Sequence, residues 1–174
     1  MRILSNTFSR TTLFACCLLI GFTACQSDDE ADDEVTVAEV RAFPLAHEEL
    51  WPHFQRFEEE AALRGYNFDL NALEITGFLE DIPRENVAGT CRYGTHINEV
   101  TIDRIFWRNS TLLRKELVVF HELGHCVLFQ AHREEIDANG NCASLMNSGT
   151  GDCRVPYTVS TRDIYIDELF AQWE

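Results

Sequence analysis

The sequence is poor in basic residues. Lys and Arg together number 14 against 29 Asp and Glu, which gives a net charge of −15 at pH 7. Nucleic-acid binding depends on clustered positive charge that neutralises phosphates, so we expect no nucleic-acid partner. A chain this acidic is also repelled by anionic lipid surfaces unless a covalent anchor holds it there.

Long apolar runs are missing as well. The run at residues 13–24 has about a dozen residues, too few to span a hydrocarbon core ~30 Å thick. Arg2 and Arg10 precede it, and residues 1–24 contain no acid, a pattern typical of a signal peptide. There is no internal repeat. A hydrophobic content of 45%, with 12 Phe, nevertheless argues for a folded domain rather than wholesale disorder.

The end of the apolar run resembles a bacterial lipobox. Residues 22–25 read Phe-Thr-Ala-Cys, with small residues before the cysteine, although the consensus prefers an aliphatic residue where Phe22 stands. The resemblance implies that residues 1–24 are removed and that Cys25 becomes the lipidated first residue. An ordinary secretory signal cut near Ala24 is the alternative, and a retained membrane anchor is a third interpretation.

The residues after Cys25 are strongly acidic. Residues 28–34 contain six acids, and like charges keep such a segment extended. We expect residues 25–37 to tether a single domain, residues 38–174, whose length suits one core. Gln26 stands where an aspartate would suggest retention at the inner membrane. The outer membrane is therefore the expected location, and the acidic stretch resembles signals for export to its outer face.

Four cysteines remain in the exported part, namely Cys91, Cys126, Cys142 and Cys153. An even number in an exported domain predicts two disulfides. Cys142 and Cys153 flank one loop rich in Gly and Asn, so we pair them, which leaves Cys91 with Cys126. A zinc site made of thiolates is the competing interpretation, but the chain has no CxxC pair.

The hydrophobic pattern predicts an α+β fold with a short mixed sheet. The expected elements are a helix at 50–64, strands at 72–79, 90–93 and 99–105, a helix at 111–129, an irregular stretch at 138–156 and a final helix from Thr161. The second helix is apolar nearly all round, so it should be central, with Asn109 or Ser110 as its N-cap. Gly124 inside it costs about 1 kcal/mol relative to Ala, which close packing against a strand would explain.

That central helix carries His121-Glu122-Leu123-Gly124-His125. Residues four apart on a helix share a face, so both imidazoles can converge on one Zn²⁺. Glu122 lies beside them, placed to take a proton from water rather than to bind the metal. Two histidines and a glutamate hydrogen-bonded inside a core are the alternative. Three ionisable side chains on a buried helix are costly unless something binds them.

Zinc needs a third protein ligand, and three residues are candidates. We rank His132 first, then Asp152 and then Glu168. A continuous helix would put His132 ~10 Å further along the axis than His125, too far to share a metal. The metal interpretation therefore requires the helix to end near residues 129–131. Otherwise His132 is a surface residue, Asp152 a loop residue and Glu168 part of a solvated helix face.

The helix HELGH, a following histidine and a later Ser-Leu-Met-Asn segment at residues 144–147 together resemble the metzincin zinc peptidases. The resemblance implies that His121, His125 and His132 bind zinc and that Glu122 is the general base. It also implies a turn beneath the metal that contains Met146, an edge strand at residues 100–103 that aligns a peptide, and a C-terminal helix from Thr161.

The sequence departs from the metzincin pattern at several points. Phe129 stands near the position of the family's turn glycine, and His132 comes one residue late. Ser148 replaces a tyrosine that many such turns carry, for which Tyr157 is a candidate substitute. A methionine in a loop is by itself more often plain packing. The other histidines, His47, His53 and His96, have no partner pattern and are interpreted as ordinary.

These observations predict a zinc-dependent metalloendopeptidase anchored to the cell envelope, in which Glu122 activates water. The expected cofactor is one Zn²⁺, and the expected partners are a protein or peptide substrate and the lipid anchor, with the chain a monomer. The alternative is a surface binding or adhesion lipoprotein with a structural zinc site. Glu122 argues against it, because a structural site needs no carboxylate beside its ligands.

Overall fold

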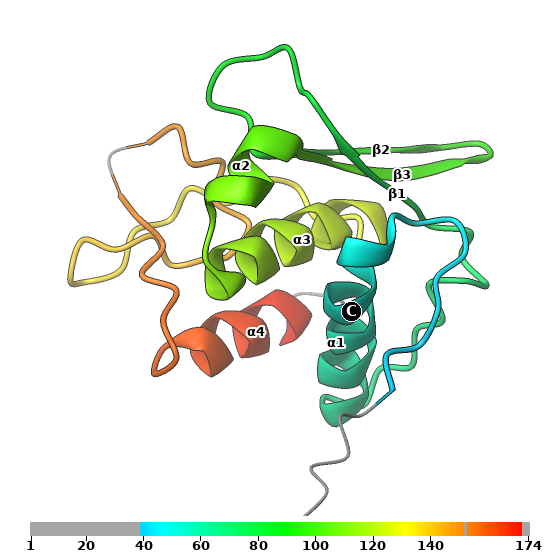
Figure 1. The fold of residues 1–174 in the computed structure, drawn as a ribbon. Helices are drawn as coiled ribbons and strands as arrows, with labels where there is room; N and C mark the ends of the chain where they lie inside the picture. Colours follow the sequence, from blue (N-terminus) through cyan, green and yellow to red (C-terminus); the bar gives the residue numbers. More distant parts are fainter. Residues whose placement is uncertain (1–38, 152, 172–174) are drawn as a thin grey trace, which may run out of the picture. The chain divides into compact units, whose positions relative to one another are not determined.

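Helix α3 (Leu112–Cys126) is the central helix of the domain in the computed structural model (Figure 1). Its apolar residues are buried around the helix, among them Val119, Phe120 and Leu123, so the predicted central position is confirmed. The N-cap is Thr111, whose side-chain oxygen accepts the N–H of Arg114. The predicted N-caps are wrong, because Asn109 and Ser110 terminate a short helix that the pattern did not reveal.

The structure describes residues 39–151 and 153–171. Backbone contacts group residues 38–174 into one compact unit. The predicted signal peptide at 1–24, the lipidation site Cys25 and the linker at 25–37 lie outside the described residues, as does Asp152. Within the described part, no helix is both long enough and apolar enough to cross a lipid bilayer.

A sheet of three strands covers one side of α3 (Figure 1). Its strands are β1 (Thr76–Glu80), β2 (Gly89–Gly94) and β3 (Ile97–Asp103) in the order β1-β3-β2. β3 pairs in parallel with β1 and antiparallel with β2. The expectation that residues 100–103 form an edge strand is therefore wrong, because β3 is central and β2 lies at the edge.

Two strand boundaries differ from the predicted ones. The strand expected at 72–79 begins only at Thr76, because Glu74 has a positive φ of 51° in the preceding turn. The strand expected at 99–105 ends at Asp103, whose carboxylate accepts the N–H of Phe106 and so caps helix α2 (Arg104–Asn109). Because Asp103 caps a helix, the residues from Arg104 onward are helical although their apolar pattern continues that of the strand. The strand expected near 90–93 is present as β2.

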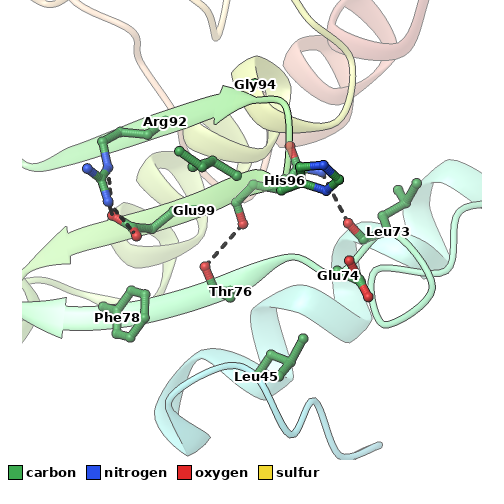
Figure 2. Close-up of a pocket in the computed structure, with 11 residues that line it drawn as sticks. Leu45, Leu73, Glu74, Thr76, Phe78, Arg92, Gly94, His96 and Glu99 are labelled. Carbon is green, nitrogen blue, oxygen red and sulfur yellow. Dashed lines mark hydrogen bonds and ion pairs between the residues drawn. The ribbon is translucent and has the colours of Figure 1, made fainter.

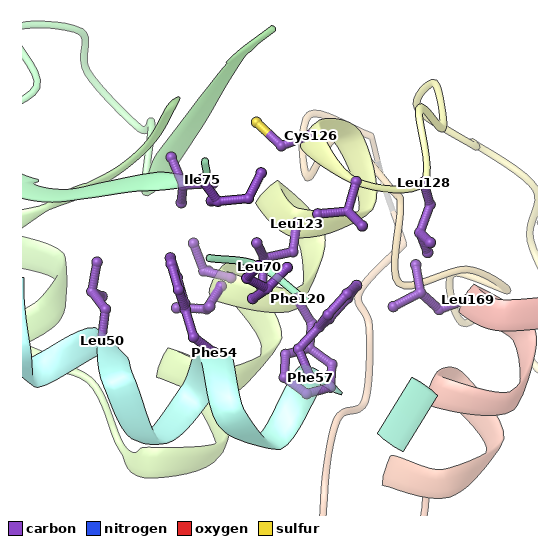
Figure 3. Packing of buried hydrophobic residues seen from close by; sticks show 14 of the residues in the cluster. Leu50, Phe54, Phe57, Leu70, Ile75, Phe120, Leu123, Cys126, Leu128 and Leu169 are labelled. Carbon is purple, nitrogen blue, oxygen red and sulfur yellow. The ribbon is translucent and has the colours of Figure 1, made fainter. Parts of the chain in front are cut away.

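Helices α1 (Trp51–Leu63) and α4 (Arg162–Ala171) pack against the other side of α3. A short 3-10 turn (Glu48–Leu50) precedes α1, and Gly65 follows it with a φ of 87°, as a C′ glycine should. Phe57 of α1 is fully buried beside Phe120 of α3 (Figure 3). Its ring centroid lies 5.3 Å from that of Phe120 and 5.2 Å from that of Phe170. Burying such a ring stabilises the fold by about 1.5–3 kcal/mol.

The last helix, α4, begins where the sequence predicts it. Residues buried on α4 are Tyr165, Ile166, Leu169 and Phe170. Ile164 on the opposite face is 66% exposed. The Thr161 hydroxyl, just before the helix, donates to the carbonyl of Pro156 and accepts the N–H of Thr158.

Both predicted disulfides are present. Cys91 of β2 bonds to Cys126 at the end of α3, and Cys142 bonds to Cys153 across the irregular loop. Such cross-links typically contribute about 2–4 kcal/mol, mainly by restricting the unfolded chain. The first also fixes β2 alongside the C-terminal half of α3. Helices and a mixed sheet in this arrangement confirm the α+β class.

Candidate metal centre

His121 and His125 lie one turn apart on α3, and their side chains face each other. The two Nε2 atoms are 3.1 Å apart. Their proximity follows from the helix, since side chains at i and i+4 are neighbours on its surface.

His132 reaches the same place because α3 ends at Cys126. Phe129 takes a positive φ of 53°, and the N–H of Gln130 bonds back to the carbonyl of Gly124. This reversal brings Nε2 of His132 to 3.3 Å from Nε2 of His121. The three ligand nitrogens lie within 4.8 Å of one another, and we call His121, His125 and His132 the histidine triad. The helix break that a shared metal requires is thus present.

The outer nitrogens of two triad members are fixed by backbone carbonyls. Nδ1 of His121 lies 3.0 Å from the carbonyl oxygen of Leu145, and Nδ1 of His125 lies 2.6 Å from that of Gln130. A carbonyl oxygen only accepts, so both Nδ1 atoms carry the proton. Burial lowers the pKa of His121 to about 4 and also lowers the pKa of His125, so both rings are neutral at pH 7.

Two bare Nε2 lone pairs therefore face each other inside the triad, and neither can donate to the other. A cation between them resolves this conflict. Two nitrogens, each 2.0–2.1 Å from one tetrahedral zinc ion, are separated by about 3.3 Å. The observed separations of 3.1 and 3.3 Å fit that geometry. Carbonyl acceptors on the far side of ligating histidines are the usual supporting shell of such a site.

Glu122 lies beside the triad with no partner of its own. Its side chain is only 5% exposed, and no described residue forms a hydrogen bond or ion pair with its carboxylate. Burial raises the pKa of Glu122 to about 8. Gly89 of β2 passes so close that a Cβ there would lie 2.8 Å from Cγ and Oε1 of Glu122. Only glycine at this point of β2 leaves room for the carboxylate.

Met146 packs directly against α3 in the turn of residues 144–149, which we call the Met146 turn. It is fully buried, and a Cβ on Gly124 would lie 2.5 Å from its sulfur. The neighbour that requires glycine at position 124 is thus Met146, with Leu169 next to it, and not the strand expected from the sequence. Leu145 in the same turn supplies the carbonyl that orients His121.

The residues just after His132 hold the Met146 turn in place. The N–H of Arg133 donates to the carbonyl of Met146 over 2.9 Å. The Glu134 carboxylate accepts the side-chain amide of Asn147 at 2.8 Å and the N–H of Ser148 at 3.3 Å. The segment that follows His132 is therefore bonded directly to the Met146 turn.

Of the two rival ligands, Glu168 is not part of the cluster that the described residues form. Glu168 of α4 forms an ion pair with Arg133 at 2.8 Å and accepts the hydroxyl of Ser144 at 2.9 Å. Its side chain is 20% exposed, so it is neither a triad neighbour nor a solvated residue but a brace between α4 and the Met146 turn. Asp152 lies outside the described residues.

No protein-family model, curated protein or solved structure matches this chain. Its function therefore has to be inferred from the chemistry that its own residues assemble.

The remaining candidates from the sequence lie elsewhere. Tyr157 donates its hydroxyl to Glu116 at 2.6 Å, so this hydroxyl, the suggested substitute for the turn tyrosine, is already engaged by a carboxylate. His47 accepts the N–H of Glu49 and His53 packs edge-on against Trp107, as ordinary histidines do.

A hollow of about 500 Å³ lies on the outer face of the sheet, the face opposite α3 (Figure 2). Phe78 of β1 and His96 at the β2–β3 turn border it, and the ion pair of Arg92 with Glu99 crosses it. None of the triad residues lines it. The hollow and the triad are therefore on opposite sides of the sheet.

Several residues of the centre had no signal in the sequence. Gln130 acts through its backbone carbonyl, which any residue could supply, and its side chain donates to the carbonyl of Leu169 at 2.6 Å. Glu134 sits in a run of charged residues that looks like ordinary surface. Gly89 could have been suspected only by knowing which strand lies against Glu122.

Proposed function

We propose that this chain is a zinc-dependent endopeptidase of the metzincin kind. One observation carries the proposal: three imidazoles converge, two of them with bare Nε2 atoms turned inward, beside a buried carboxylate to which no described residue bonds. A structural zinc site has no need of the Glu122 carboxylate. If Glu122 were only a core residue, its buried carboxylate would be expected to have hydrogen-bond partners.

The residues present fit a zinc ion, which the histidine triad would hold. When bound, Zn²⁺ supplies a Lewis acid that polarises a carbonyl and makes water a nucleophile near neutral pH. A divalent charge next to Glu122 also favours its ionised form, reversing the effect of burial on its pKa. Glu122 then accepts a proton from the attacking water on a carboxylate oxygen and passes it to the leaving amine nitrogen.

The edge strand β2 gives a peptide a place to bind. In the described part of the chain, β2 is paired only with β3, so its other edge can accept an extended peptide by backbone hydrogen bonds. Gly89 places this edge against Glu122. The strand that aligns the substrate in this proposal is thus β2, in place of the strand at 100–103.

The Met146 turn adds to the resemblance with metzincins. Met146 lies against α3 between the two histidines of the helix, and the segment that carries His132 is bonded to the same turn. Phe129 adopts the positive φ for which the family uses glycine, which accounts for the extra residue before His132.

The proposed location is the outer membrane, through a lipid on Cys25. This part of the proposal rests on the lipobox at residues 22–25 and on Gln26. Residues 25–37 would then tether the domain as a monomer at the membrane surface. Metabolic labelling with a fatty-acid analogue, in the wild type and in Cys25→Ser, tests it, since only the wild type should be labelled.

Glu122→Gln is the decisive variant for the enzymatic proposal. It should retain zinc but lose peptide cleavage by about 10²–10⁴-fold, because the amide cannot take the proton. The measurement is cleavage of a mixed peptide library by zinc-loaded wild type and variant, with zinc content determined in parallel. A wild type that binds zinc and cleaves nothing would instead support the binding lipoprotein with a structural metal.

A further inference from the structure

Two exposed aromatic side chains meet where β2 passes the end of α3. The rings of Tyr93 and Phe129 are 5.5 Å apart at an angle of 72°, an edge-to-face contact. Tyr93 is 54% exposed and Phe129 63% exposed. Exposed apolar side chains that lie together, unlike single ones, can mark a surface that binds a partner or ligand.

The pair continues a line of contacts that starts at the proposed catalytic residue. Alternate residues of a strand point to the same face, so Gly89, Cys91 and Tyr93 all face α3. Gly89 meets Glu122, Cys91 is bonded to Cys126, and Tyr93 meets Phe129. The aromatic pair therefore lies on the same face of the sheet as the histidine triad, further along the free edge of β2.

Phe129 is also directly connected to the triad. The next residue, Gln130, supplies the carbonyl that orients His125. The φ of 53° at Phe129 is costly for a bulky residue, and a glycine would form the same turn without strain. A strained backbone that keeps a large exposed ring points to a use for that ring.

We propose that Tyr93 and Phe129 form a substrate subsite for an aromatic or large aliphatic side chain on the N-terminal side of the scissile bond. The inference rests on the proposed endopeptidase function. A substrate side chain opposite Tyr93 on an added strand would lie ~4.5–5.5 Å from it, within contact of both rings.

The side of the scissile bond follows from strand direction. β2 runs from Gly89, beside Glu122, to Gly94. A peptide that pairs antiparallel with it, as β3 does on the other edge, runs from the Tyr93 end towards Glu122. At ~3.4 Å per residue, the side chain opposite Tyr93 precedes the scissile bond by about two to four residues.

The test uses the zinc-loaded full chain and a peptide cleaved in the library. Phe is placed in turn at each of the four positions before the scissile bond and compared with Ala. The wild type should favour Phe at one of these positions by about tenfold in kcat/KM. Tyr93→Thr and Phe129→Gly should each lose most of this preference, measured as the ratio of kcat/KM for the Phe peptide to that for the Ala peptide. Phe129→Gly suits its backbone, so loss of folding is not expected.

Phe78→Thr provides the matched control. Phe78 is an aromatic residue of the same sheet, 37% exposed, but on the outer face (Figure 2), so its loss should leave the preference intact. Calorimetric titration of Glu122→Gln, which should bind the peptides without cleaving them, should show higher affinity for the Phe peptide that the wild type prefers than for the Ala peptide.

Each outcome decides one of the two proposals. Cleavage with no preference at these positions, or a preference that survives in Tyr93→Thr and Phe129→Gly, overturns the subsite and leaves the peptidase. A preference that Phe78→Thr also removes overturns the subsite too. Absence of any cleavage by the wild type overturns the proposed function, and the subsite with it.

Discussion

Glu60 and Glu122 are equally buried, each only 5% exposed, but their surroundings are opposite. Glu60 of α1 receives Arg64 and Arg162, each at 2.7 Å. Glu122 of α3 has no partner among the described residues. Two glutamates of equal burial thus differ in their partners: Glu60 is paired with two arginines, whereas Glu122 is paired with no described residue.

The pKa values of the two carboxyls diverge accordingly. Burial alone would raise the pKa of Glu60, but hydrogen bonds from Arg162 and Arg64 outweigh it and lower the pKa. At Glu122 burial acts unopposed and raises the pKa to about 8. A buried carboxylate with partners belongs to the fold, whereas one without partners indicates a site where a bound charge is expected.

Removing Glu60 should give the largest loss of stability among the tests of this comparison. Glu60→Ala leaves Arg64 and Arg162 partly buried without their shared partner, at a cost of about 3 kcal/mol in the free energy of unfolding. Urea denaturation measures it. Glu59→Ala, whose pair with Arg56 is exposed, should change stability by less than about 0.5 kcal/mol. Equal effects at both positions would show that Glu60 does not hold the helices together.

Gly124→Ala should disturb the region of Glu122 through packing rather than charge. The new Cβ would overlap the Met146 sulfur, so we expect a loss of about 1–3 kcal/mol and weaker zinc binding. Chemical denaturation and zinc titration are the measurements. Gly94→Ala, where a Cβ meets nothing within 4 Å, is the control. If Gly124→Ala changed neither stability nor zinc affinity, Met146 would be able to move away from α3 and would not be held in a fixed position there.

The pH dependence of stability should carry opposite signs for the two glutamates. Because the folded pKa of Glu60 is depressed, its contribution is present above its unfolded pKa and is lost as pH falls through the folded value. Because the folded pKa of Glu122 is raised to about 8, it costs metal-free protein stability as pH rises from its unfolded pKa towards 8.

Urea unfolding of metal-free protein at pH 5 and pH 8 measures the Glu122 effect. Wild type should lose at least about 1 kcal/mol more than Glu122→Gln over this interval. Added zinc should abolish the difference. If the unfolding free energies of metal-free wild type and Glu122→Gln changed equally with pH, the description of Glu122 as a buried carboxyl without partners would be contradicted.

Elements with strong local signals were predictable from the sequence. The apolar helix with its HELGH segment, the strand near 90–93 and both disulfides follow from periodicity and from cysteine spacing. A shared metal requires His132 to approach His121 and His125, so this approach could be predicted. The end of helix α3 before His132 could not be predicted from nearby residues, because Phe129 takes a backbone conformation that is normally adopted by glycine.

Features set by tertiary contacts were beyond the sequence. The order of the strands depends on long-range pairing, so β3 looked like an edge strand although β2 occupies that place. Gly124 seemed to require a strand, because the pattern does not show that a loop twenty residues later returns to α3. Glu168 looked solvated, since its partner Arg133 lies on a distant segment.

The most direct test of the account is the zinc content of the purified full chain. Elemental analysis after dialysis would compare wild type, His132→Ala and the control His96→Asn, which suits the positive φ at that position and lies outside the triad. The account predicts about one zinc per chain in wild type and control, and loss or strong depletion in His132→Ala. Undiminished zinc in His132→Ala, or none in the wild type even after refolding with added zinc, would contradict it.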